Sequence, residues 1–337
     1  MLLGVVAGAA LAVASAAAAA FTPSLAVGHT PPTAGSSGTT AVRVTVPRDD
    51  DALFRAQIYV APGYTANLTQ APGSQLGTVT AQVRVREPID GAVLPLTGTI
   101  VVTDQATVGA AGAQCTGTPV HAAYWVLVLQ ASGQELRVPM FVDPASGAVA
   151  AVASHVLTVC LPSPHIPVAA GGATFGAKLI QAQLNLRGVF TAPTGSASHR
   201  WNVVATPWPN GPGLPNAAGT VSAQAVVSLP AAVSLAATSR KRVVTIRGRV
   251  TEAGSGIAGQ QVTLRVGTRS YRARTNASGA YRLAVRVRKG ARVAVRATVA
   301  VPARSAACTT PSPFPVPCVG ETRQFFTATR SLVARVR

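Results

Sequence analysis

The chain has 337 residues, with 29 Lys and Arg, 10 Asp and Glu, five His and four Cys. The charge is concentrated: residues 238–337 hold 20 bases and two acids, a net +18, whereas residues 1–237 hold nine bases and eight acids, a net +1. This asymmetry indicates a separate basic module with an anionic partner or surface. The shortage of acids and histidines, and the absence of zinc-peptidase, nucleophile-elbow and phosphate-loop motifs, argue against an enzyme and against a metal or cofactor site.

The first 40 residues predict an exported protein. Residues 1–20 are uncharged, small or aliphatic and end in an Ala-x-Ala site, which predicts a cleaved secretory signal, with a retained membrane anchor as the alternative. Residues 21–40 are rich in Pro, Gly, Ser and Thr and predict a flexible leader. We therefore expect a secreted or envelope-associated protein that touches a membrane only if the signal is retained.

Four cysteines in an exported chain predict disulfides, although unpaired buried cysteines would fit a reducing compartment. Four cysteines allow three pairings. We expect Cys115–Cys160 and Cys308–Cys318, because each pair joins residues of one predicted domain and the second closes a short proline-rich loop. In the chain-entropy model each bridge stabilises the fold by about 2–4 kcal/mol.

Residues 41–229 predict one all-β sandwich domain, of a family that the sequence does not identify. Apolar and polar residues alternate with period two in segments such as 79–86, which is typical of strands with one buried face. The runs 124–129 and 156–161 are apolar on both faces and predict central strands of a double sheet. One short helix is expected near Asp51, and residues 230–239 are expected to form a linker.

The basic part, residues 240–337, predicts a second β-sandwich, so the fold class is all-β with two sandwich domains in tandem. Six short alternating runs carry this expectation. They are 243–250, 261–266, 271–275, 281–287, 292–299 and 331–336.

Three features of this part suggest a family: a Gly-x-Val strand at 248–250, an Ala-Gly-x-x-Val entry at 258–262, and a Thr-Asn-Ala-x-Gly-x-Tyr corner at 275–281. With these, residues 244–296 resemble the carboxypeptidase regulatory-like domains, transthyretin-related β-sandwiches akin to bacterial Ig-like surface domains. The resemblance implies an accessory module, with the Cys308–Cys318 segment inserted before the last strand. None of the five histidines is followed by Glu three residues on, so the zinc motif of those peptidases is absent.

Five arginines predict a row of guanidinium groups on the solvent face of a sheet, because they alternate with apolar residues. They are Arg282, Arg286, Arg288, Arg292 and Arg296. One interpretation is a polyanion-binding surface for an anionic cell-wall polymer, glycan or lipid head group; nucleic acid fits less well, since no aromatic residues interleave. The other is a solvated face in a chain whose 26 arginines and three lysines reflect a GC-rich genome.

The remaining polar and aromatic residues leave alternatives open. Asp49 to Asp51 suit a solvated turn or helix cap better than a calcium loop. Trp201 and Trp208 predict either core packing or a platform for carbohydrate binding.

We expect a non-catalytic binding or structural protein of the envelope or extracellular space. The alternative is a secreted hydrolase whose active site is hidden in residues 41–229, where a triad would combine His121, His155 or His199 with Asp104 or Asp143. A structural role is commoner for such histidines. The hydrolase needs a pocket in which a His is bonded to both a carboxylate and a Ser or Thr hydroxyl.

Overall fold

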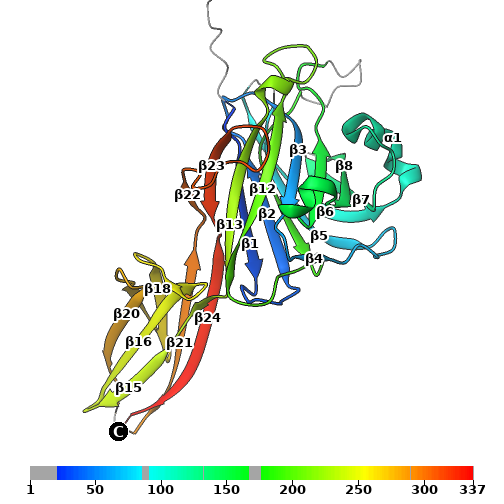
Figure 1. Ribbon diagram of the computed structural model, residues 1–337. Helices are drawn as coiled ribbons and strands as arrows, with labels where there is room; N and C mark the ends of the chain where they lie inside the picture. Colours follow the sequence, from blue (N-terminus) through cyan, green and yellow to red (C-terminus); the bar gives the residue numbers. More distant parts are fainter. Residues whose placement is uncertain (1–20, 86–90, 132, 167–175, 289, 337) are drawn as a thin grey trace, which may run out of the picture.

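The computed structural model describes residues 21–85, 91–131, 133–166, 176–288 and 290–336. The signal predicted at 1–20 lies outside them. The described chain is all-β, as expected, and its buried apolar side chains form two large clusters. One cluster lies in a larger lobe and the other in a basic lobe that continues from one end of it (Figure 1).

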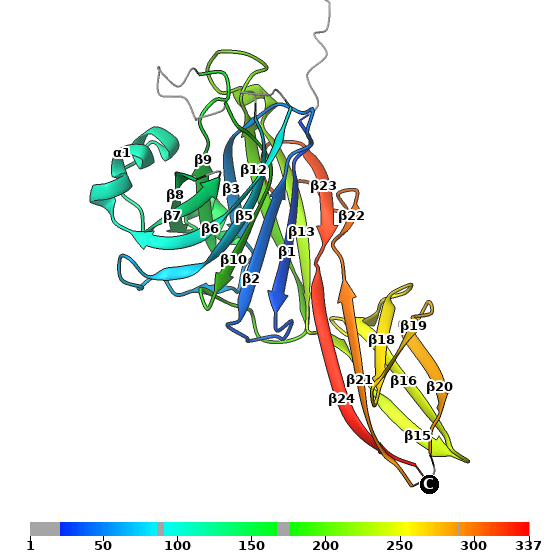
Figure 2. The ribbon, with the colours of Figure 1, turned by 180° about the vertical axis from the view of Figure 1, so that it is seen from behind.

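The larger lobe is built on one 13-stranded sheet, in the order β1-β2-β10-β5-β6-β7-β8-β9-β3-β12-β13-β23-β22. Its strands are β1 (Ser24–Thr30), β2 (Thr39–Thr45), β3 (Leu53–Val60), β5 (Gln75–Arg84), β6 (Val93–Thr103), β7 (Ala123–Ala131), β8 (Gln134–Pro144), β9 (His155–Cys160), β10 (Lys178–Arg187), β12 (Ala197–Pro207), β13 (Val221–Leu229), β22 (Arg304–Ala306) and β23 (Cys318–Arg323). Short β4 (Thr65–Ala66) and β11 (Phe190–Thr191) pair with each other. The sheet folds back on itself, so that β1 lies against β13 and β23 (Figure 2).

Alternation with period two produces this core as predicted. In β5, Val79, Ala81 and Val83 are buried while Thr80 and Gln82 are exposed. The runs that are apolar on both faces form β7 and β9, which pair with strands on both sides. Side chains on both faces of β7 are buried, because the helix and its neighbours cover one face and the main core covers the other.

The leader predicted at 21–40 is wrong. Residues 24–30 form β1, which pairs along its whole length with β2, and the side chains of Leu25 and Val27 are 0% exposed. The strand has seven residues, and the Pro- and Gly-rich composition around it led to the prediction of a flexible leader. Its apolar side chains nevertheless reach the core.

The helix predicted near Asp51 is also wrong, since the chain there runs directly into β3. The helix is α1 (Gln105–Thr116). Asp104 caps its N-terminus by accepting from the backbone N–H of Thr107 at 2.8 Å, and Gly117 ends it with a φ of 86°. Single turns of 3-10 helix follow at η1 (Gly147–Ala151) and η3 (Ala217–Gly219).

The basic lobe is a sandwich of two sheets around the second core cluster. The sheet around β16 contains β14 (Ala231–Val233), β15 (Ala236–Arg240), β16 (Val243–Glu252), β17 (Ser255–Gly256) and β20 (Ala280–Arg286). The sheet around β21 contains β18 (Gln261–Val266), β19 (Arg269–Arg274), β21 (Arg292–Val301) and β24 (Phe326–Arg335). The predicted linker 230–239 is therefore wrong, because β14 and β15 belong to this sandwich.

The corner at 275–281 has the structural role that its residues predict. The Asn276 carboxamide oxygen accepts from the backbone N–H groups of Ser278 and Ala280, and Gly279 has a φ of 76°. Tyr281 then enters the core, and its hydroxyl donates to the Ser234 carbonyl at 2.6 Å.

The segment between β21 and β24 leaves the basic lobe. Its strands β22 and β23 extend the edge of the larger sheet, with β23 parallel to β13. The segment that contains Cys308 and Cys318 is thus inserted before the last strand, as the resemblance to regulatory-like domains implies. It packs on the larger lobe, however, and not on the basic lobe. The Thr322 hydroxyl donates to the Leu25 carbonyl across the folded sheet.

Candidate anion-binding surfaces

The five arginines predicted as a row are all exposed, but they do not share one face. Arg282 and Arg286 lie on β20 in the β16 sheet, and Arg292 and Arg296 lie on β21 in the opposite sheet. Arg288 lies in the connection between the two strands. The single row is therefore wrong: alternation within each strand points its arginines outward, but the two strands belong to opposite layers.

Each outer face instead carries arginines from several strands. On the β21 sheet, Arg265 stands directly opposite Arg296, and Arg292 stands opposite Arg335. Arg272 and Arg274 on β19 add to this face. Directly opposed like charges destabilise a sheet. Repulsion of this kind is relieved when an anion binds between the guanidinium groups.

The outer face of the β16 sheet also carries arginines from neighbouring strands. Arg247 stands opposite Arg282, and Arg240 and Arg286 flank Val243 from the two neighbouring strands. All four guanidinium-bearing residues are exposed. Sequence reasoning missed Arg240 and Arg247 because it considered one strand at a time, whereas the face forms from pairing across strands.

The two acids of the basic part are used elsewhere. Glu252 binds Arg304 through both carboxylate oxygens, at 2.7 and 2.6 Å. Glu321 is 1% exposed and pairs with Arg200 and Arg323 at 3.2 and 3.1 Å. These ion pairs lie where the segment containing β22 and β23 meets the two lobes, so neither acid of the basic part is left to neutralise the arginine faces.

The far end of the basic lobe holds a third concentration of charge. A hollow of about 880 Å³ there is bordered by Lys241, Arg242, Arg269, Arg286 and Arg288. None of the five forms an ion pair within the part of the chain that the structure describes. We call this the distal hollow; its lining also includes apolar residues and Tyr271.

Two of these cations lie in the turn between β15 and β16, where the backbone has a strained conformation. Lys241 and Arg242 are the two residues of the hairpin loop and have φ values of 48° and 67°. A two-residue hairpin turn with positive φ at both positions favours Asn-Gly. Side chains other than Gly pay a conformational cost there, and strain of this kind occurs at functional sites.

Both predicted disulfides are present. Cys115, at the end of α1, is bonded to Cys160 at the end of β9, and Cys308 is bonded to Cys318. The loop closed by the second bridge packs on the larger lobe, where the rings of Phe314 and Tyr59 lie 4.3 Å apart.

A histidine in the larger lobe has the contacts that the hydrolase alternative requires. His121 Nδ1 lies 2.7 Å from Asp143 Oδ2, and Nε2 lies 3.1 Å from the Thr116 hydroxyl. However, the Thr116 hydroxyl also has the carbonyls of Gly112 and Thr118 as acceptors, at 2.9 and 3.0 Å, and Nε2 itself lies 3.0 Å from the Thr118 carbonyl. The His121 side chain is 1% exposed. The contacts of His121 with Asp143 and Thr116 therefore fix the end of α1 and do not activate Thr116 toward a substrate.

Of the two alternatives for the tryptophans, the structure shows core packing. Trp201 is fully buried against Tyr64 and Phe190. Trp208 is 9% exposed, packs edge-on to Phe54, and donates from Nε1 to the Leu161 carbonyl at 3.0 Å.

Among the described residues, no three His, Cys, Asp or Glu side chains come close enough to hold a metal ion. Asp50 accepts from the backbone and hydroxyl of Thr22, at 2.6 and 2.9 Å. Within the same residues, no helix has the length and hydropathy needed to span a membrane.

No protein-family model matches the chain, and no curated protein matches it. Similar solved structures include a tetra-tandem repeat from the extending region of a large adhesion protein, 14% identical, covering 95% of this chain and 75% of that chain, with a TM-score of 0.24. Another is that of a 1.5-MDa bacterial ice-binding adhesin, 11% identical, covering 93% of this chain and 96% of that chain, with a TM-score of 0.20. Sequence identities and TM-scores this low define neither family nor function. The resemblance to carboxypeptidase regulatory-like domains therefore stays a prediction.

Proposed function

We propose that this is an extracellular or envelope protein whose basic lobe binds an anionic polymer without catalysing a reaction. The observation that carries the proposal is the set of arginines opposed across strands, Arg265 with Arg296, Arg292 with Arg335, and Arg247 with Arg282. The described strands that form these faces carry no acid there. A fold that keeps such pairs bears a repulsion that an anionic ligand removes.

The distribution of the arginines favours a polymer over a small anion. They lie on both outer faces and around the distal hollow, and neighbouring strands are spaced about 4.8 Å apart. A ligand with repeated charges can contact several guanidinium groups at once. Guanidinium binds carboxylate and phosphate through two parallel hydrogen bonds, so uronic and phosphodiester polymers both fit.

The two disulfides support a location outside a reducing compartment. The predicted signal at 1–20 agrees with that location. An acidic glycan or wall polymer is the class of ligand such a protein meets there.

A binding panel with the full chain tests the proposal. The panel contains polygalacturonate, poly(glycerol phosphate), DNA and neutral dextran. We expect binding to the first two and none to dextran. Exposed charge contacts contribute up to about 1 kcal/mol each, so R265Q/R296Q and R247Q/R282Q should each weaken binding about tenfold.

The matched control is R137Q, which removes an exposed arginine of the larger lobe. It should bind like the unaltered protein. Equal binding by all variants, or binding to dextran as strong as to the charged polymers, contradicts the proposal.

A further inference from the structure

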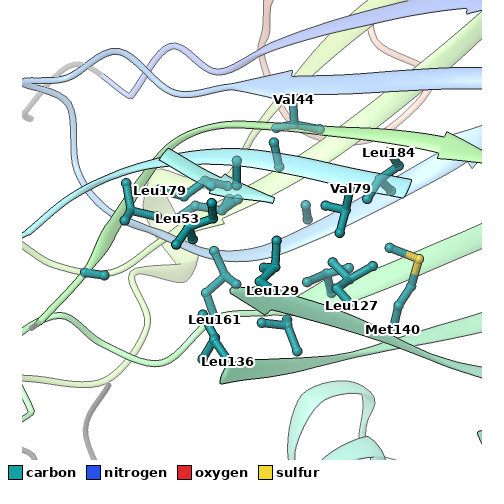
Figure 3. Close-up of a pocket in the computed structure, with 18 of the residues that line it drawn as sticks. Val44, Leu53, Val79, Leu127, Leu129, Leu136, Met140, Leu161, Leu179 and Leu184 are labelled. Carbon is teal, nitrogen blue, oxygen red and sulfur yellow. The ribbon is translucent and has the colours of Figure 1, made fainter. Parts of the chain in front are cut away.

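The larger lobe contains a cavity that is separate from the arginine faces. It has a volume of about 110 Å³. Its walls come from eight strands that are consecutive in sheet order, from β2 through β10, β5 to β9 and β3, so the curved sheet wraps around it. Figure 3 shows the leucine, valine and methionine side chains that surround the space.

Among the described residues, the wall offers nothing to a polar ligand. All 21 of them that line the cavity are Ala, Val, Leu, Ile, Met or Pro. A water molecule inside a protein needs two to four polar partners, and apolar cavities without them stay dry. An apolar cavity of about 150 Å³ binds benzene or xenon. The space here is smaller, at about 110 Å³, so it suits a narrow aliphatic chain better than a ring.

One end of the cavity reaches solvent. Leu136 is 39% exposed, and Leu161 and Leu179 are half-buried, whereas Val79 and Met140 toward the other end are 1% and 0% exposed. Figure 3 shows Leu136 and Leu161 together on one side and Met140 on the other.

The backbone is irregular at the open end. The pairing of β10 with β5 shifts register between Leu179 and Gln181. Such a bulge redirects side chains and is frequent next to binding sites. Leu179, at this shift, lines the cavity and is half-buried.

We propose that the larger lobe binds a short aliphatic chain, of about six carbons, which enters between Leu136, Leu161 and Leu179 and ends beside Met140. The chain is either a free hydrocarbon or the end of an amphiphile. This site is independent of the arginine faces, and its ligand is held by burial of apolar surface alone.

The sequence provides a selective probe, because Met140 is the only methionine besides Met1. Full-length protein labelled with 13C at the methionine methyl groups is titrated with 1-hexanol, with hexanoate and with 1,6-hexanediol. We expect a saturable shift of the Met140 resonance with hexanol, and none with the diol, because its second hydroxyl would be buried beside Met140 without a hydrogen-bond partner. A shift with hexanoate as well shows that the site accepts the tail of a charged amphiphile, and a shift with hexanol but not with hexanoate shows that it takes only an uncharged chain.

Two variants fill the cavity and one serves as control. Ala182 and Ala81 both line the space, so A182L should weaken hexanol binding at least tenfold and the smaller A81V should weaken it in the same direction. A284L adds the same side chain on the exposed face of β20 and should bind hexanol like the unaltered protein. The absence of a saturable Met140 shift, or equal binding by A182L, A81V and A284L in folded protein, overturns the proposal.

Discussion

At the scale of single residues, the basic lobe holds side chains in positions that cost stability. Lys241 and Arg242 occupy a turn that favours Asn-Gly, and they border the distal hollow with their charges unpaired among the described residues. We interpret this turn as a site where a conformational cost is retained because the side chains contact a ligand.

The double substitution K241N/R242G tests this interpretation. It supplies the residues that the turn favours, so the free energy of unfolding should rise by about 2 kcal/mol. The affinity for polyanion should fall, because two cations are lost. Denaturant unfolding and polymer binding are measured on the same samples. K241Q/R242Q separates the two effects, since it should weaken binding equally without raising stability; a stabilised double variant with unchanged binding contradicts a role for the turn.

Buried histidines give the larger lobe a defined response to acid. Burial lowers the pKa of His29, and a hydrogen bond with the Ser36 carbonyl partly opposes the shift. Burial likewise lowers the pKa of His155 and His199. The folded state thus favours neutral imidazole, so this contribution to stability is complete above the ordinary pKa of 6.5 and is lost as the pH falls below it.

We therefore expect the free energy of unfolding to decrease between pH 7 and pH 5. H29N should reduce the steepness of that decrease, because the substituted side chain cannot take up a proton in the unfolded state. Urea unfolding across this pH range measures the free energy of unfolding of the unaltered protein and of H29N, and so gives the pH dependence of each. An unchanged pH dependence in folded H29N is the contradicting outcome.

At the scale of strands, much of the architecture follows from alternation in the sequence. The runs 243–250, 261–266 and 292–299 are strands β16, β18 and β21, with bounds within two residues. Alternation also predicts correctly that arginines point outward. It does not say which strands share a sheet, and so Arg282 and Arg296 were expected on one face although they lie on opposite layers.

Other features escaped prediction for separate physical reasons. The helix α1 lacks an apolar stripe, because its buried residues include Gly109 and Gly112, which have no side chain to form one. The strand β1 is short and lies among turn-forming residues. The aliphatic cavity depends on how eight strands curve together, which no local pattern of residues encodes.

The arginine pairs make a prediction at the same scale. R296E places a carboxylate opposite Arg265 and so replaces repulsion by attraction. The free energy of unfolding should rise by about 1 kcal/mol at low ionic strength, and the gain should shrink as salt is added. The control is T298E, since Thr298 stands between Thr263 and Thr329 and has no arginine directly opposite. Equal effects of the two variants on thermal unfolding contradict the proposed repulsion.

At the scale of the whole molecule, the lobes are joined by several passes of chain. The connections from β13 to β14, from β21 to β22 and from β23 to β24 all cross between them, each with only a few residues (Figures 1 and 2). Gln324, in the last crossing, is fully buried and donates to the Ser228 carbonyl at 2.6 Å. The ion pairs of Glu252 and Glu321 lie beside these crossings. The arrangement holds the basic lobe out from the larger lobe, with both arginine faces open to solvent.

The dependence of polymer binding on salt tests the central claim most directly. The full chain is titrated with polygalacturonate and with poly(glycerol phosphate) at increasing sodium chloride concentrations. We predict that the logarithm of the affinity falls linearly with the logarithm of the salt concentration, and that the slope is shallower for R265Q/R296Q, because fewer counterions are released. Binding that is absent at low salt, or that does not weaken as salt rises, contradicts an anion-binding basic lobe.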